Sequence, residues 1–459
     1  MTIYSYANSL NRIRLTRGHL KIVAQNATVF SWYNQKMIFR NSLLLAFFSA
    51  LSLLLGIVRD RLLADYVGIG HVLDLYNISF RIPDLLYGSL LAFISAATVV
   101  PFLTKEDTNG HQISPLHRLI SLTSLFLAIN VVVGFFLFAS LPYIAHFIVP
   151  TFNEGELAEY VHLTRILMVQ PLFLGLASLF SCYAQLRNEF FLLGVSPLLY
   201  SFGIIYGILY FYPTYGVDGL IYGVVIGAFL SLLLQAFSLR TLRKHHFKHF
   251  FSWHLTKEAI RLALPRTGTN LITQVRVIIF HGFATTLGPG FLSAYLFASR
   301  ITEAVVQIFQ QSFSTASIPV LSKAYTEKRM DAYKGIVKKY TSLLFIAGIF
   351  FSSCIFVLQD KVIGLLYGQS NMSHLIAYFL LGALIGLPFQ MLNGYLSISF
   401  YSIHDAKSVM YAYLGASIIA VIIVKYGTGA GPFMLMLGNL TFWITSTLFL
   451  LTCYSRKKI

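Results

Sequence analysis

The sequence consists of long apolar runs, each about as long as a helix that crosses a bilayer, and this constrains the fold more than any other feature. A transmembrane helix needs about 20 mostly apolar residues, and such runs recur from residue 39 to residue 453. Hydrophobic residues make up 56% of the 459 residues and charged residues 11%, whereas soluble proteins carry about 25% charged residues. The runs are too continuously apolar for the alternating strands of a membrane β-barrel. The sequence therefore predicts an all-α polytopic membrane protein.

We predict about twelve membrane-spanning helices in two six-helix lobes around a central cavity. The expected spans are 39–66, 73–103, 117–145, 157–186, 190–212, 217–240, 257–286, 291–322, 336–358, 373–402, 407–426 and 431–453. The expected domains are a basic cytoplasmic N-terminal arm (1–38), an N-terminal lobe (39–243), a basic cytoplasmic linker (244–256) and a C-terminal lobe (257–459).

The distribution of basic residues predicts the orientation of the chain. Most of the 34 lysines and arginines lie in every second connection and in the two ends of the sequence, and cytoplasmic segments of membrane proteins carry this excess. Both termini are therefore expected in the cytoplasm. The net charge of +17 needs no nucleic-acid partner to explain it, and the basic loops are suited to anionic lipid headgroups. The scattered Cys182, Cys354 and Cys453 predict neither a disulfide scaffold nor a metal site, and we expect no cofactor.

Arginines inside the predicted spans are the most informative residues. There are seven of them: Arg59, Arg61, Arg81, Arg165, Arg266, Arg276 and Arg300. An arginine at the centre of a lipid-facing helix costs about 2.5–3.5 kcal/mol on insertion scales. Arg61 and Arg165 lie near span ends, where they are as well explained as interfacial anchors. Arg276 and Arg300 lie deep in their spans, so we expect them to face a wet cavity or an acidic partner.

Polar residues next to these arginines follow the period of a helix. In span 291–322 they are Arg300, Glu303, Gln307, Gln310 and Ser314, and in span 257–286 they are Arg266, Thr269, Thr273 and Arg276. Each set forms a stripe on an otherwise apolar helix. The stripes predict a cavity, although hydrogen bonding between helices explains Gln and Thr equally well, and Glu303 is placed to neutralise Arg300. Carboxylates in the spans are few, so we expect a positive interior that favours an anionic ligand such as a phosphate.

An internal repeat supports the two-lobe arrangement. Gly68-Ile-Gly70 precedes Arg81 and Gly288-Pro-Gly290 precedes Arg300 at nearly the same spacing, and a Pro-X-Leu-Ser/Thr-Lys motif follows each arginine. The two copies are six spans apart, which predicts parallel halves related by an axis along the membrane normal. Arg81 and Arg300 would then occupy equivalent positions.

Several motifs in their order resemble the MurJ/MviN lipid II flippase family, within the multidrug/oligosaccharidyl-lipid/polysaccharide exporter superfamily. They include Gly56-Ile-Val-Arg59-Asp60, Gly68-Ile-Gly70, Asp74, Arg81-Ile-Pro-Asp-Leu-Leu86, Ala298-Ser-Arg300, Pro319-Val-Leu-Ser322 and Phe400-Tyr-Ser-Ile-His-Asp405. The resemblance implies a V-shaped pair of lobes that moves an undecaprenyl-diphosphate-linked peptidoglycan precursor across the bacterial inner membrane. It implies cavity roles for Arg59, Asp74 and Arg300.

The sequence also departs from the family pattern. Family arginines fall on Leu53 and Tyr87, and a family acidic residue falls on Ala92; Arg266 and Arg276 are expected to replace the lost charge. Family members typically carry two more C-terminal helices, which form a groove for the lipid tail, and family sodium sites use acidic residues that span 257–286 lacks. We therefore expect no ion.

We accordingly predict a transporter, and not an enzyme, that flips lipid II by alternating access with its diphosphate held by cavity arginines. The predicted substrate-binding residues are Arg59, Asp74, Arg81, Arg266, Arg276, Arg300 and Glu303. The expected partners are the undecaprenyl-diphosphate-linked saccharide-peptide, membrane lipids and cell-wall synthesis proteins. A flippase for another polyprenyl-diphosphate-linked oligosaccharide, of the O-antigen or capsule type, is the main alternative. A multidrug or cation antiporter is less favoured because arginines outnumber carboxylates, and a glycan-polymerising enzyme because no nucleophile–base pair is present.

Overall fold

The computed structural model describes residues 43–94, 115–244, 253–368, 372–403, 405–427 and 431–456, together with residues 41, 99 and 103. Throughout these ranges the chain forms helices and turns, without a β-strand. Nine helices there are long and apolar enough to cross a membrane, which confirms the all-α membrane fold but not the count of twelve. Their bounds are Leu43–Val67, Leu116–Ile148, Glu154–Leu186, Phe190–Tyr215, Val217–Arg240, Met330–Tyr367, Ser373–Ser402, Ala406–Tyr426 and Phe433–Arg456. The predicted arm 1–38 lies outside the described residues.

Three further predicted spans are also helical but more polar. The second is divided at Phe80 into α3 (His71–Ser79) and α4 (Arg81–Ile94), and the seventh is the continuous α12 (Trp253–Thr286). The eighth consists of α13 (Phe291–Val305), a π-helical turn, η4 (Val306–Gln310), and α14 (Gln311–Thr326). These helices carry the polar residues predicted to line the cavity, which is why they are less apolar than the other nine.

The N-terminal lobe is built around α11, which packs against α8 and α9. Its helices are Leu43–Val67 (the first helix), α3, α4, α6 (Pro115–Ile148), α7 (Glu154–Leu167), α8 (Gln170–Leu186), α9 (Phe190–Tyr206), α10 (Tyr212–Tyr215) and α11 (Val217–Ala236). Glycines let α9 and α11 approach closely: a Cβ on Gly203 would lie 2.3 Å from Cα of Gly227. This use of small residues is typical of helix pairs in membranes.

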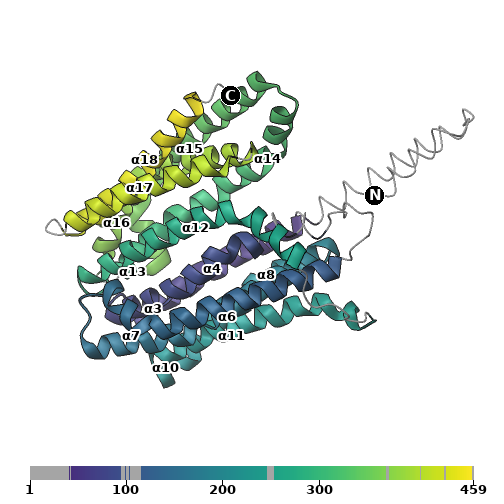
Figure 1. Ribbon diagram of the computed structural model, residues 1–459. Helices are drawn as coiled ribbons and strands as arrows, with labels where there is room; N and C mark the ends of the chain where they lie inside the picture. Colours follow the sequence, from purple (N-terminus) through teal and green to yellow (C-terminus); the bar gives the residue numbers. More distant parts are fainter. Residues whose placement is uncertain are drawn as a thin grey trace, which may run out of the picture.

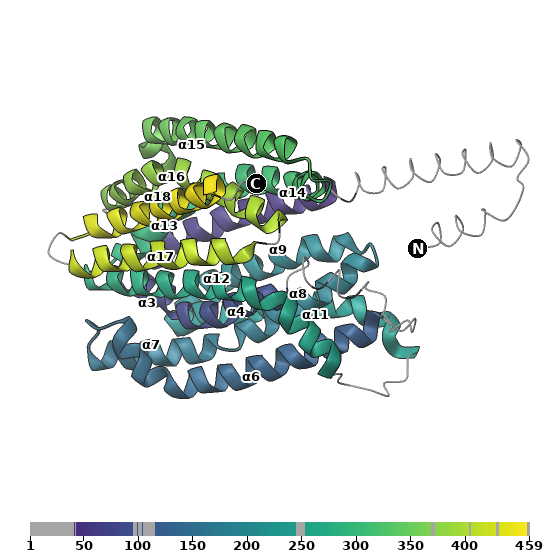
Figure 2. The ribbon, with the colours of Figure 1, turned by 45° about the horizontal axis from the view of Figure 1, so that its top comes forward.

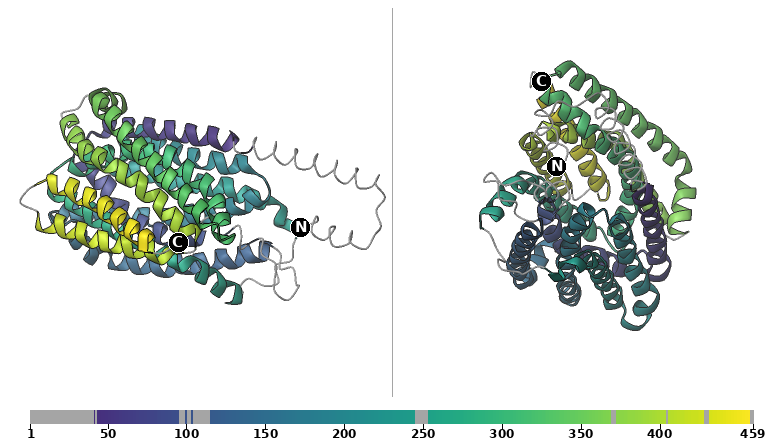
Figure 3. Two further views of the ribbon diagram at one scale, coloured as in Figure 1. Left: turned by 90° about the horizontal axis from the view of Figure 1, so that it is seen from above. Right: turned by 90° about the vertical axis from the view of Figure 1, so that its right-hand side faces the viewer.

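The C-terminal lobe is built around α16, which packs against α13, α15 and α18. Its helices are α12, α13, α14, α15 (Met330–Tyr367), α16 (Ser373–Ser402), α17 (Ala406–Tyr426) and α18 (Phe433–Arg456). In Figure 1 this lobe lies above the N-terminal lobe, and the end-on view of Figure 3 separates the two groups. The structure thus shows two helical lobes, while the exact domain boundaries stay predictions.

Two differences from the predicted helix bounds have local physical causes. α15 runs from Met330 to Tyr367, well beyond the predicted 336–358, because helical turns with Lys334 and Lys361 continue the apolar core at both ends. α12 begins at Trp253, inside the predicted linker 244–256, of which residues 245–252 are not described.

The lobes meet along two seams. On one, α4 and α12 lie side by side (Figures 1 and 2), and Asn270 Nδ2 donates to the carbonyl of Gly88 at 3.3 Å. On the other, the first helix lies at the edge between the lobes (Figure 3, right). It packs Phe48 against Phe191 of α9, while its far end contacts α13 and α15. We call the end of the molecule where this helix begins the Leu43 end, and the opposite one the Gly290 end.

Candidate functional site

Four arginines lie at a similar depth in the bundle. Counted from the helix bounds at the Gly290 end, Arg59, Arg81, Arg276 and Arg300 lie about 12–15 Å along their helices, since an α-helix rises 1.5 Å per residue. This depth is close to the middle of a hydrocarbon core of about 30 Å. Four of the seven arginines singled out by the sequence therefore lie at a similar distance from the Gly290 end, although they do not share one cavity.

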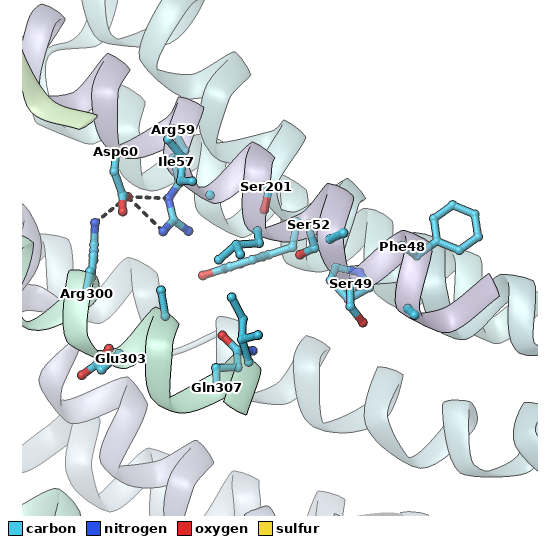
Figure 4. Close-up of a pocket in the computed structure, with 18 of the residues that line it drawn as sticks. Phe48, Ser49, Ser52, Ile57, Arg59, Asp60, Ser201, Arg300, Glu303 and Gln307 are labelled. Atoms are coloured by element: carbon cyan, nitrogen blue, oxygen red, sulfur yellow. Dashed lines mark hydrogen bonds and ion pairs between the residues drawn. The ribbon is translucent and has the colours of Figure 1, made fainter. Parts of the chain in front are cut away.

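Arg59 and Arg300 meet at a single carboxylate, that of Asp60. Arg59 donates to Asp60 Oδ1 through Nε and lies within ion-pair distance of it through Nη2, both at 3.0 Å. Arg300 Nη1 pairs with the same oxygen. Figure 4 shows Arg59 and Asp60 on the first helix and Arg300 on α13 pointing toward one another. Asp60 thus joins the two lobes at the level of the arginines.

These three side chains form one wall of a cavity of about 1190 Å³. The first helix, α9, the α13–η4 segment and the end of α15 surround it. Polar and small lining residues include Ser49, Ser52, Gly56, Arg59, Asp60, Gly194, Ser201, Arg300, Glu303 and Gln307. Of the predicted substrate-binding residues, Arg59, Arg300 and Glu303 are therefore brought together, and Glu303 and Gln307 follow Arg300 on successive turns (Figure 4).

The charge of the cavity differs from the expected positive excess. Its lining carries Arg59 and Arg300 but also Asp60 and Glu303, so the formal charges of these side chains balance. Sequence reasoning gave Asp60 no role in the site. The available signal was its position next to Arg59 within a span, where carboxylates are rare and usually paired.

Asp74 connects the lobes at the Gly290 end instead of lining this cavity. Its carboxylate accepts hydrogen bonds from the backbone N–H of Gly290 at 2.6 Å and from the N–H and Oγ of Ser293 at 2.7 and 2.5 Å. These amides are at the N-terminus of α13, where the helix dipole favours a negative charge. Asp74 is 2% exposed. Its predicted role in substrate binding stays a prediction, and the contacts described here are structural.

The remaining predicted residues that the structure describes do not line this cavity, although Arg81 interacts electrostatically with Arg300 and Glu303. Arg81 donates from Nε to the carbonyl of Asn77 at 3.3 Å and pairs with Asp84 at 3.5 Å, within the α3–α4 segment. Arg276 is buried in the C-terminal lobe with its guanidinium 3.9 Å from the ring centroid of Phe442. Neither lines the cavity around Asp60, and the side chain of Arg266 is not among those described. No cluster of three metal-ligating side chains occurs in the described part of the chain.

The sequence of this chain matches the model of a known protein family. The model of the family described as "Lipid II flippase MurJ" matches residues 63–458. The chain belongs to this MurJ family. MurJ proteins are lipid flippases, so the chain is a transporter and not a catalytic enzyme, and it is a multi-pass protein of the inner membrane.

Relatives and solved structures agree with this assignment. The probable lipid II flippase MurJ of Borreliella burgdorferi is 24% identical over 395 residues, which are 82% of this chain and 75% of that protein. The one of Buchnera aphidicola subsp. Acyrthosiphon pisum is 26% identical over 426 residues, covering 89% and 82%. The fold is similar to that of the lipid II flippase MurJ in an inward closed conformation (TM-score 0.75, 21% identity, 90% of this chain and 87% of that one). It also resembles an inward-facing multidrug resistance MATE family transporter of the MOP superfamily (TM-score 0.70, 15% identity, 88% and 94%).

Proposed function

We propose that this MurJ-family protein flips lipid II, the undecaprenyl-diphosphate-linked saccharide-peptide, with the diphosphate held by Arg59 and Arg300. The observation that carries the proposal is the sharing of Asp60 between these two arginines inside one cavity. A diphosphate cannot cross hydrocarbon alone, because burying unpaired charge is prohibitive. Two guanidinium groups replace its hydration while the lipid tail stays in the bilayer.

Asp60 has a definite task in this proposal. It holds Arg59 and Arg300 close together when no substrate is bound, and it compensates their charges in the membrane interior. A diphosphate offers each arginine two oxygens. Two oxygens match the parallel N–H groups of a guanidinium better than one shared carboxylate oxygen does. Substrate binding is thus an exchange of partners, and release is the reverse exchange.

Alternating access supplies the movement. The lobes are joined at the Gly290 end by Asp74 with α13 and by Arg61 with the end of α15. The cavity extends from Asp60 along the first helix to Leu45, that is, toward the Leu43 end. With both termini in the cytoplasm, as the basic residues predict, this state accepts substrate from the inner leaflet. Rocking of the lobes would break the contacts at the Gly290 end and release the substrate outward. Contacts with cell-wall synthesis proteins stay a prediction from the resemblance.

Complementation tests the proposal. The wild-type chain is expressed in a bacterium depleted of its own lipid II flippase, and growth and lipid II accumulation are measured. We expect rescue by the wild type, and loss of rescue with Arg59→Ala or Arg300→Ala despite normal membrane insertion. Arg456→Ala, an exposed arginine at the end of α18, is the matched control and should rescue. Full growth with both cavity variants would rule out the arginine role. Failure of the wild type here, with rescue of an O-antigen flippase mutant, would point to the other lipid-linked oligosaccharide.

A further inference from the structure

Arg276 is a buried arginine whose charge has no counter-charge among the residues that the structure describes. It lies on α12 and is 7% exposed. Its Nε is buried without a hydrogen-bond partner. The titratable groups that interact with it electrostatically include the hydroxyls of Tyr295 and Tyr413 but no carboxylate. An unpaired charge buried in this way is destabilising unless something neutralises it.

Aromatic rings account for only part of the environment of Arg276. The ring of Phe442 on α18 lies 3.9 Å from the guanidinium carbon, and that of Phe280 on the same helix lies 5.4 Å away. Rings stabilise a cation through the face of the guanidinium plane. The N–H groups of arginine point outward in that plane, and the Nε–H of Arg276 still lacks an acceptor. A water molecule would accept a hydrogen bond but would not compensate the charge.

A neighbouring side chain adds a second unsatisfied nitrogen atom. His281, one and a half turns further along α12, is 5% exposed, and its Nδ1 is buried without a hydrogen-bond partner. It interacts electrostatically with both Arg276 and Arg81, and its ring packs edge-on against Tyr295. The region between α12, α13, α17 and α18 therefore offers two buried, unsatisfied nitrogen atoms next to a full positive charge.

We propose that Arg276 binds a small inorganic anion, such as chloride, inside the C-terminal lobe beside Tyr295 and Tyr413. The anion accepts hydrogen bonds from the guanidinium in its plane and neutralises its charge. It must be small, because the burial of Arg276 excludes a lipid headgroup. The site is separate from the cavity of Arg59 and Arg300, and the proposal does not depend on the flippase function.

Thermal unfolding of the purified full-length protein tests this proposal. Unfolding midpoints are compared in chloride, in bromide and in gluconate at constant ionic strength; gluconate is too large for the site. A ligand that binds only the folded state raises the midpoint with its concentration until saturation sets in. We expect chloride and bromide to raise the wild-type midpoint, and the Arg276→Gln variant to lose this rise. An equal midpoint in all three salts would overturn the proposal.

Two control variants test whether the chloride response depends on Arg276 and not on other arginines. Arg240 also lies over an aromatic ring, that of Phe237 at 4.6 Å, but it is paired with Glu189 at 3.1 Å, so Arg240→Gln should keep the chloride response. Arg300→Gln should keep it as well, and its loss there would move the anion to the cavity. Because Arg276→Gln could fail to fold, anomalous scattering from wild-type crystals grown in bromide gives a second readout. A bromide peak beside Arg276 supports the proposal, and peaks confined to other arginines contradict it.

Discussion

Asp74 and Ser293 hold the two lobes together by two hydrogen bonds to one carboxylate oxygen, from the N–H at 2.7 Å and from Oγ at 2.5 Å. Nearby, Arg61 Nη1 donates to the carbonyl of Gly364 at 3.0 Å, in the last turn of α15. A negative side chain thus caps the start of one C-terminal-lobe helix and a positive side chain caps the end of another, each matching the helix dipole. Both belong to the N-terminal lobe, so the Gly290 end closes through complementary charges.

Asp74→Asn should weaken this closure. The amide group offers one acceptor atom and brings donors toward backbone N–H groups, so we expect a loss of about 1–3 kcal/mol, the penalty for a buried unsatisfied group. Ile69 lies beside Gly290 at this closed end. In a background without Cys182, Cys354 and Cys453, a membrane-impermeant thiol reagent should label Ile69→Cys faster when Asp74→Asn is present. Unchanged labelling would show that Asp74 does not control the closure.

Arg61→Ala should also weaken the closure of the Gly290 end, but less than Asp74→Asn does. Its side chain is 39% exposed and also pairs with Asp65, and a cation at a helix C-terminus contributes about 0.3–1 kcal/mol. The same labelling of Ile69→Cys measures it. Arg61→Lys keeps the charge and should restore slow labelling, whereas equal rates in the Ala and Lys variants would exclude a role for the charge.

Asp60→Asn should tighten binding of a diphosphate lipid and slow its transport. The carboxylate that competes for Arg59 and Arg300 is removed, and a change of about 1.4 kcal/mol corresponds to a tenfold change in affinity. Binding is measured with a fluorescent diphosphate lipid in nanodiscs, and transport with the same lipid in proteoliposomes. Weaker binding in Asp60→Asn would mean that Asp60 positions the arginines for the ligand and does not compete with it.

Gly203→Ala should destabilise the N-terminal lobe. The new methyl group would lie 2.3 Å from Cα of Gly227, a backbone atom that cannot move without separating α9 from α11, and overpacking typically costs about 1–3 kcal/mol. Gly415→Ala is the control, because a Cβ at that position of α17 meets open space and helix propensity favours alanine. A lower unfolding midpoint for the first variant only is expected; equal midpoints would show that the two helices separate easily.

The helices and part of the site followed from the sequence, because both depend on local patterns. The length of an apolar run is enough to predict a membrane-spanning helix. Helical spacing placed Arg300, Glu303 and Gln307 on one face, and in the structure these residues line one cavity with Arg59. The contacts between lobes did not follow. Helical phase showed that Arg276 shares a face with Thr269, but not that this face meets Phe442 of α18. Similarly, the position of Asp74 did not indicate that its partner would be the first turn of α13.

The pairing of Arg59 with its sequence neighbour Asp60 has a consequence for biosynthesis. The first helix has few protein contacts, with 6% of its apolar stretch buried compared with 56% for α16, and it leaves the ribosome long before α13 supplies Arg300. A bare guanidinium would hinder insertion at that stage. Because the carboxylate is adjacent on the same helix, the segment enters the membrane as a self-neutralised dipole, and Arg300 joins this pair only when the second lobe has been synthesised.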